Sequence, residues 1–166
     1  FEYEAKPLQP SEVNIKVETC GICHSDISAI DNSWGKSKYP MVAGHEIIGK
    51  IIDVGTNVSL HKIGDRVGLG WHSGYCNDCE HCDAEDHNFC SSTNKTVYSQ
   101  YGGFSEQVTA EEVSVIPIPN NLNHKDAGPL LCGGITVFTP IVEFNITKKH
   151  KVGIIPVDSE HSAIFQ

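Results

Sequence analysis

The most constraining feature of this sequence is a run of four cysteines between residues 76 and 90. Cys76, Cys79, Cys82 and Cys90 have the spacing C-x2-C-x2-C-x7-C. Three thiols that recur every third residue can converge on one ion from successive turns, and the fourth can close a tetrahedron from the returning chain. Zinc accepts four thiolates in this geometry, and a site whose four positions are all filled by protein is structural. The run therefore predicts a structural zinc lobe.

An iron–sulfur cluster or a set of disulfides would also use closely spaced cysteines, but the sequence favours neither. Bacterial iron–sulfur sites have a last gap of three residues and a following proline, whereas here the last gap is seven residues and Ser91 follows Cys90. A secreted disulfide scaffold has an even number of cysteines as a rule, and this chain has seven and no visible export signal. We expect bound metal in a reducing cytoplasm. The segment lacks strand or helix periodicity, so metal binding, worth about 10–16 kcal/mol in zinc-finger peptides, would have to order it.

The rest of the chain alternates mostly with the two-residue period of β-strands. At 166 residues the chain has the length of one domain. Alternating or β-branched segments predict strands at 13–17, 47–54, 66–69 and 113–116, the last stopped by Pro117. Short strands separated by glycine and asparagine turns favour a small barrel or sandwich. We expect a mainly β fold with some α structure.

The pattern becomes helical after residue 120. Asn121 or Asn123 could cap a helix that runs through Asp126, and residues 135–144 are apolar enough for a second helix, which Pro140 would bend. Residues 151–155 then read as a new buried strand.

Charge and composition exclude two classes of partner. The chain has 12 Lys and Arg against 21 Asp and Glu, a formal net charge of -9, and thiolates bound to zinc would make the balance more negative. Nucleic-acid binding needs clustered basic residues, so we expect no nucleic-acid partner. No stretch approaches the roughly 18 apolar residues of a membrane span, so we expect no membrane insertion. The lack of an initiator methionine leads us to expect that the true N-terminus is missing.

Three cysteines lie outside the run: Cys20, Cys23 and Cys132. Two thiolates and one imidazole from separate segments make a known catalytic zinc arrangement, with the fourth position left for water or substrate. Spacing alone cannot pair such distant ligands, and a lone cysteine or histidine is more often a packed core residue. That is the interpretation we adopt for Cys20.

A family resemblance sharpens this interpretation. The segments 23–26 (Cys-His-Ser-Asp), 44–46 (Gly-His-Glu) and 131–136 (Leu-Cys-Gly-Gly-Ile-Thr) occur in order around the four-cysteine run. Together they resemble the zinc-containing medium-chain alcohol dehydrogenases, and within them the cinnamyl-alcohol-dehydrogenase-like branch with its broad-range aldehyde reductases. The resemblance covers nearly the whole chain to about residue 155. It implies a GroES-like barrel catalytic domain that carries the four-cysteine zinc lobe.

The resemblance also implies roles for the residues around the metal. Cys23, His45 and Cys132 would hold a catalytic zinc ion. Glu46 would approach the ion and assist exchange of its fourth ligand, and Asp26 would orient His45. The chain would then bind two zinc ions, and the catalytic one would act with NADP(H) on a small alcohol or aldehyde.

Further roles follow from the resemblance for residues around the reacting groups. Ser25 would touch the substrate oxygen and begin a proton relay, and His24 would lie near the cofactor pyrophosphate. Trp34 and Trp71 align with positions that line the substrate cleft. Many relatives have histidine where this chain has Ser28, a difference that the aldehyde-reductase branch shares; it leaves the outer relay open.

The resemblance fails at the end of the chain. The dinucleotide fingerprint G-x-G-x-x-G should follow the strand at 151–155, but those places hold Pro156, Asp158 and His161. We therefore expect a GroES-like zinc catalytic domain at residues 1–150 and, at 151–166, a remnant of the first strand of a missing Rossmann domain. Such a chain would be inactive alone, and its full-length parent would be a cytoplasmic enzyme and a possible homodimer. The alternative is a non-catalytic zinc-binding module or an inactive fragment.

Overall fold

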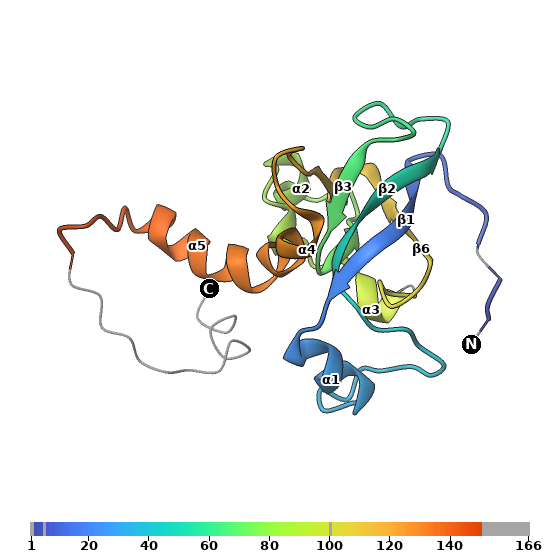
Figure 1. The fold of residues 1–166 in the computed structure, drawn as a ribbon, viewed down its shortest axis with the longest axis horizontal. Helices are drawn as coiled ribbons and strands as arrows, with labels where there is room; N and C mark the ends of the chain where they lie inside the picture. Colours follow the sequence, from blue (N-terminus) through green and yellow to red (C-terminus); the bar gives the residue numbers. More distant parts are fainter. Residues whose placement is uncertain (1, 5, 100, 151–166) are drawn as a thin grey trace.

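The protein is built on a curled antiparallel sheet (Figure 1). The computed structural model describes residues 2–4, 6–99 and 101–150. Within them the sheet has the strand order β6-β1-β2-β3-β7. These strands are β1 (Glu12–Gly21), β2 (Glu46–Val54), β3 (Arg66–Leu69), β6 (Gln107–Glu111) and β7 (Val115–Pro117). The expectation of a mainly β fold is confirmed.

Strand alternation in the sequence places the hydrophobic core on one face of the curled sheet. Val13 and Ile15 of β1 are fully buried, and they pack with buried residues of β2 and β3 such as Ile47 and Leu69. Irregularities in the pairing of β1 with β2, between residues 14 and 15 and between 17 and 19, interrupt the ladder. Such bulges increase the local twist of a strand, which fits the curl of the sheet.

The predicted strands at 13–17, 47–54 and 66–69 correspond to β1, β2 and β3, and the last has the predicted bounds. The prediction at 113–116 is wrong at both ends. Residues 112–114 form a 3₁₀ turn, and the strand β7 begins at Val115 and includes Pro117. Proline is tolerated because β7 is an edge strand that pairs only with β3 in the described sheet.

The four-cysteine segment is not devoid of regular structure, which corrects the sequence-based interpretation. It contains a single helical turn, α2 (Glu80–Asp83), and a 3₁₀ turn at residues 87–89. A two-stranded ribbon of β4 (His72–Gly74) and β5 (Asn94–Lys95) flanks the segment. These elements are too short to show periodicity in the sequence.

Short helices follow β1, β5 and β7 along the chain. They are α1 (His24–Ile30), α3 (Thr96–Ser99) and α4 (His124–Ala127). Asn123 caps α4, because its side chain accepts a hydrogen bond from the Lys125 N–H. Of the two predicted caps, Asn123 is therefore the correct one. A 3₁₀ turn at residues 128–131 follows α4 directly.

The predicted second helix is α5 (Gly133–Glu143), which begins two residues earlier than expected and contains Pro140. It extends away from the sheet (Figure 1). None of its residues is buried, and Val137 and Phe138 are 65% and 58% exposed. The strand expected at 151–155 lies outside the described residues, as does the rest of the segment 151–166. In the described part of the chain, no helix has the length and apolar character needed to cross a bilayer.

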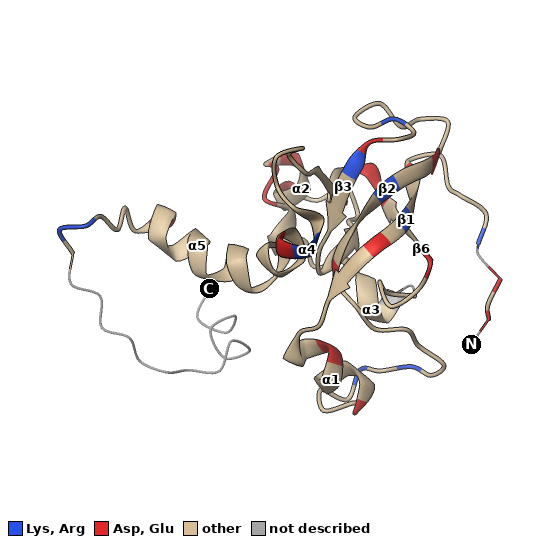
Figure 2. Cartoon of the chain, viewed as in Figure 1, with Lys and Arg blue, Asp and Glu red and all other residues tan. Residues whose placement is uncertain are grey.

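Asp and Glu residues occur in several elements of the described chain, among them α1, α2 and α4, and Lys and Arg residues occur at separate places along it (Figure 2). This distribution agrees with the net charge of -9.

Candidate metal centres

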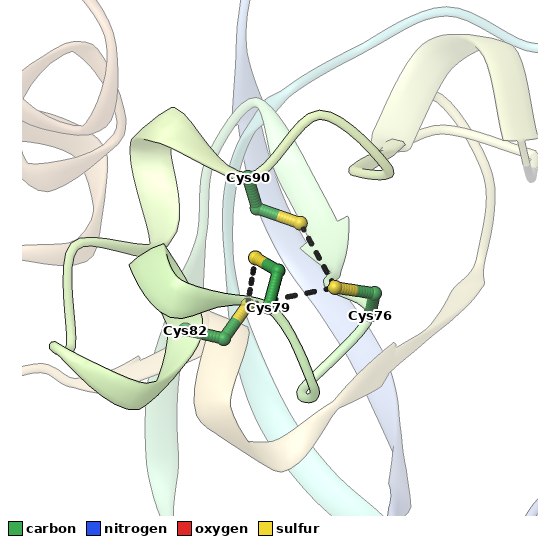
Figure 3. A group of neighbouring side chains, drawn as sticks. All are labelled: Cys76, Cys79, Cys82 and Cys90. Atoms are coloured by element: carbon green, nitrogen blue, oxygen red, sulfur yellow. Dashed lines mark hydrogen bonds between the residues drawn. The ribbon is translucent and has the colours of Figure 1, made fainter.

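The four cysteines of the lobe converge on one point (Figure 3). Cys76 Sγ lies 3.5 Å from Cys90 Sγ and 3.9 Å from Cys82 Sγ, and Cys79 Sγ lies 3.6 Å from Cys82 Sγ. A tetrahedral zinc ion with Zn–S bonds of about 2.3 Å separates its sulfur ligands by about 3.8 Å. The observed separations fit this geometry, and none of the four thiols forms a disulfide. The donor set is that of a closed structural zinc site.

A carboxylate on the neighbouring sheet binds the segment that leads into the four-cysteine lobe. Glu111, the last residue of β6, accepts hydrogen bonds from the Tyr75 N–H at 3.3 Å and from Asn77 Nδ2 at 2.8 Å. These two residues flank Cys76. The chain then turns sharply at Asn77, whose φ of 58° is left-handed, before it reaches Cys79, which directly precedes α2. The lobe is thus tied to the sheet on the side of its first ligand.

A second group of metal-ligating side chains lies at the end of the sheet where β1 ends and β2 begins. The ligand atoms of Cys23, His45, Glu46 and Cys132 all lie within 4.8 Å of one another. Cys23 follows β1, His45 and Glu46 stand at the start of β2, and Cys132 immediately precedes α5. The fold therefore brings together three segments that are far apart in the sequence.

The distances in this second group also fit a zinc ion. Cys23 Sγ lies 3.8 Å from Cys132 Sγ, and His45 Nε2 lies 3.3 Å from Cys132 Sγ. Two sulfurs bound to one tetrahedral zinc ion are about 3.8 Å apart. Cys23, His45 and Cys132 offer two thiolates and an imidazole, and the Glu46 carboxylate is a fourth donor in the same group. When Glu46 does not bind the ion, one coordination position is open, which is the donor pattern of a catalytic site. The two groups thus differ in kind: one is closed and the other is open.

Asp26 holds two residues of the open group in place through hydrogen bonds. Its Oδ1 accepts hydrogen bonds from the Gly44 N–H at 2.8 Å and from His45 Nδ1 at 2.9 Å, and its Oδ2 accepts one from the Cys23 N–H at 3.1 Å. The bond at Nδ1 leaves Nε2 of His45 with a free lone pair toward the metal position. One carboxylate therefore fixes both a ligand ring and the backbone of a second ligand.

The electrostatics of this carboxylate follow from the same contacts. Burial raises the pKa of Asp26, but the hydrogen bonds from His45, Cys23 and Gly44 together outweigh it and leave the pKa below its ordinary value. Asp26 is therefore ionised at neutral pH. It is 1% exposed, and His45 is fully buried.

Glu46 has the opposite electrostatic character. Burial raises the pKa of its carboxyl group, and the nearby Asp26 adds to the rise, while His45 opposes it. The residue is 5% exposed. A cation in the open group would offset this cost of burying a carboxylate.

The remaining candidate residues lie around the same group. Ser25 and His24 start α1, where Ser25 is half-buried and His24 is exposed, and Ser28 is buried one turn later. Trp71 packs edge-on against the His45 ring with ring centres 4.9 Å apart, and Trp34 packs edge-on against Trp71 at 6.1 Å. The structure thus brings both tryptophans to one side of His45.

Two further residues contribute to the site although the sequence assigned them no role. Gly44 has a φ of 102°, which only glycine adopts freely, and its N–H donates to Asp26. Tyr98 packs edge-on against Trp71, with ring centres 6.1 Å apart. The glycine directly before His45 was a visible signal for the first, whereas no local pattern marks Tyr98.

Comparisons with known proteins agree with this geometry. Residues 9–120 match the family model described as the alcohol dehydrogenase GroES-like domain. The chain is 47% identical over 157 residues to the aldehyde reductase AdhA of Synechocystis sp., a match that covers 95% of this chain and 47% of the relative. It is 39% identical over 158 residues to the probable cinnamyl alcohol dehydrogenase 9 of Arabidopsis thaliana, covering 91% of this chain and 44% of the relative.

Solved structures give the same picture. A cinnamyl alcohol dehydrogenase from Sorghum bicolor superposes with a TM-score of 0.83 at 35% identity, covering 88% of this chain and 44% of that one. The protein CAD from Helicobacter pylori, solved in complex with NADP(H), gives a TM-score of 0.80 at 35% identity over 86% and 44% of the two chains. The chain spans about half the length of the curated relatives it matches. The expectation of a GroES-like fold is confirmed.

Proposed function

Because this chain belongs to the alcohol dehydrogenase GroES-like domain family, we propose that it is the zinc-binding catalytic half of an oxidoreductase. The proposed reaction interconverts alcohols and aldehydes by hydride transfer with NADP(H). The observation that carries the proposal is the open group of Cys23, His45 and Cys132, which offers a metal ion three protein ligands and leaves one position for a substrate oxygen.

We propose two zinc ions per chain, one in each group. The ion in the four-cysteine lobe is structural because protein ligands fill its coordination. The ion in the open group would supply Lewis-acid polarisation of the substrate oxygen. The donor sets and the sulfur–sulfur separations support both assignments.

The residues around the open group divide the remaining tasks. Asp26 holds His45 in the orientation and tautomer that a metal ligand needs. Ser25, half-buried in the first turn of α1, receives the substrate's hydroxyl proton and passes it outward. Because Ser28 occupies the next turn, water or the cofactor ribose continues the relay.

The positions of three side chains indicate which part of the site would receive the substrate and which the cofactor. Trp34 and Trp71 form an apolar wall next to His45 that suits an apolar aldehyde. His24 is exposed at the start of α1, where a cofactor pyrophosphate could approach. The complete protein would be a cytoplasmic enzyme, a homodimer, and without nucleic-acid or membrane partners.

A fusion protein tests this proposal. The chain is joined in frame to the remaining half of the Synechocystis relative, loaded with zinc, and assayed with NADPH and benzaldehyde or butanal. We expect aldehyde-dependent oxidation of NADPH that Cys132→Ser abolishes. The proposal fails if the zinc-loaded fusion is inactive while the relative's own N-terminal half, expressed in the same way, is active. A chain that binds zinc in such an inactive fusion would be a non-catalytic zinc-binding module.

A further inference from the structure

Gly21 stands directly opposite Glu46, where the last residue of β1 pairs with the first residue of β2. A Cβ atom on Gly21 would lie 1.9 Å from Glu46 Oε2 and 3.0 Å from both Cβ and Cδ of Glu46. The carboxylate of Glu46 therefore occupies the space that any larger residue at position 21 would need.

Backbone conformation does not explain the glycine at this position. The glycines with left-handed φ values among the described residues are Gly35, Gly44 and Gly64, and Gly21 is not one of them. An alanine could adopt the backbone of residue 21 without strain. The glycine is required only by the space that the Glu46 side chain fills.

A third segment packs against the backbone of this residue pair. A Cβ atom on Gly128, at the junction of α4 and the following 3₁₀ turn, would lie 2.8 Å from the Glu46 carbonyl oxygen and 3.4 Å from the Gly21 nitrogen. The backbones of the three segments are thus in close contact. Glu46 is 5% exposed, so protein surrounds its side chain.

The confined carboxylate belongs to the open metal group. One of its oxygens lies within 4.8 Å of the ligand atoms of Cys23, His45 and Cys132. A carboxylate held at this distance adds negative charge beside a bound cation, and groups next to the ligands contribute roughly 10–100-fold to metal affinity.

We propose that Gly21 is a positioning residue, which keeps the Glu46 carboxylate beside the open metal group by leaving its side-chain space empty. The inference rests on the proposed zinc site and deepens it. Gly21→Ala would displace the Glu46 carboxylate, which is the far end of a flexible side chain, and would shift Glu46 Cβ by only a few tenths of an ångström. The sheet would survive, and the carboxylate would leave its place beside the metal.

The test is a double-mutant cycle on zinc binding by the whole chain. Zinc affinity of the open group is measured by competition with a chromophoric chelator for the wild type, Gly21→Ala, Glu46→Ala and the double variant. The four-cysteine lobe serves as an internal reference. We expect Gly21→Ala and Glu46→Ala each to weaken the open site by about 10-fold or more, the lobe to be unaffected, and the double variant to match Glu46→Ala alone.

A matched glycine variant separates positioning from general damage. A Cβ atom on Gly49 of β2 would lie 2.2 Å from the Lys16 carbonyl oxygen, so Gly49→Ala should lower the melting temperature without a selective effect on the open site. The inference is overturned if Gly21→Ala leaves zinc affinity unchanged, or if its effect persists in the Glu46→Ala background. If the wild type binds no metal at Cys23, His45 and Cys132, the proposed function fails as well.

Discussion

Replacing Asp26 by asparagine should weaken zinc binding at the open group although Asp26 is not itself a ligand. The carboxylate accepts three hydrogen bonds in the folded chain, two at Oδ1 and one at Oδ2. Asparagine keeps one acceptor oxygen, which can serve Gly44 and His45. It places an NH₂ group opposite the Cys23 N–H, so two donors face each other and one hydrogen bond is lost.

The size of the effect follows from that one bond. A hydrogen bond to a charged group contributes about 1.5–3 kcal/mol, and a factor of ten in binding corresponds to about 1.4 kcal/mol. Because the lost bond holds the backbone of a ligand residue, we expect zinc affinity at the open group to fall roughly 10–100-fold. Asp26→Ala removes all three bonds and should cost more than Asp26→Asn.

The assay is chelator competition on the whole chain, with the four-cysteine lobe as reference. Asp26→Asn should leave the lobe unchanged and weaken only the open site. The reasoning is refuted if Asp26→Asn binds within twofold of the wild type, or if Asp26→Ala is no worse than Asp26→Asn. Equal weakening of both sites would indicate general destabilisation and would also refute it.

Three further predictions concern other parts of the chain. Burial and the nearby Lys95 lower the pKa of His72 below 6.5 in the folded chain. As the pH drops through 6.5, the unfolded state therefore takes up a proton before the folded state does, and the stability of the fold decreases. Between about pH 7.5 and about pH 5.5 the melting temperature of His72→Gln should therefore fall less than that of the wild type. An equal fall in melting temperature for the two proteins would contradict this prediction. Glu111→Ala removes the hydrogen bonds to Tyr75 and Asn77 beside Cys76 and should speed proteolysis within residues 76–90 several-fold. An unchanged cleavage rate would show that these hydrogen bonds are dispensable. Burial raises the pKa of Cys20 to about 12, so its thiol should resist iodoacetamide at neutral pH, as mass spectrometry of the folded chain can check; labelling as fast as that of a free cysteine would be the contrary result.

The strands with clear alternation were predictable from the sequence, and β3 was predicted with its observed bounds. The start of β7 was not, because distant contacts decide it. The carboxylate of Glu112, in the 3₁₀ turn before β7, accepts hydrogen bonds from the Ser59 and Leu60 N–H groups. A local pattern of apolar residues carries no information about such contacts.

The two metal groups also differ in how far the sequence alone could predict them. The ligands of the lobe lie within one short segment, so their spacing alone predicted the site. Cys23 and Cys132 are 109 positions apart, so only a family resemblance could pair them before the structure was known. The hydrogen bond between Asp26 and Gly44 joins α1 to the segment before β2, and the sequence spacing could not predict it either.

The helix α5 shows a further limit of sequence patterns. Its apolar character predicted a helix, and an apolar helix is expected to be covered. In the described residues its side chains are half-buried at most, as Phe138 illustrates with 58% exposure. The pattern predicted the element and not its environment.

The central claim is that the chain holds one closed and one open zinc site. Native mass spectrometry of the zinc-loaded chain, compared with Cys132→Ser and Cys90→Ser, tests it most directly. The account predicts two zinc ions in the wild type and one in Cys132→Ser, with the open site still filled in Cys90→Ser. One zinc ion or none in the wild type, iron in place of zinc, or two tightly bound ions in Cys132→Ser would contradict it.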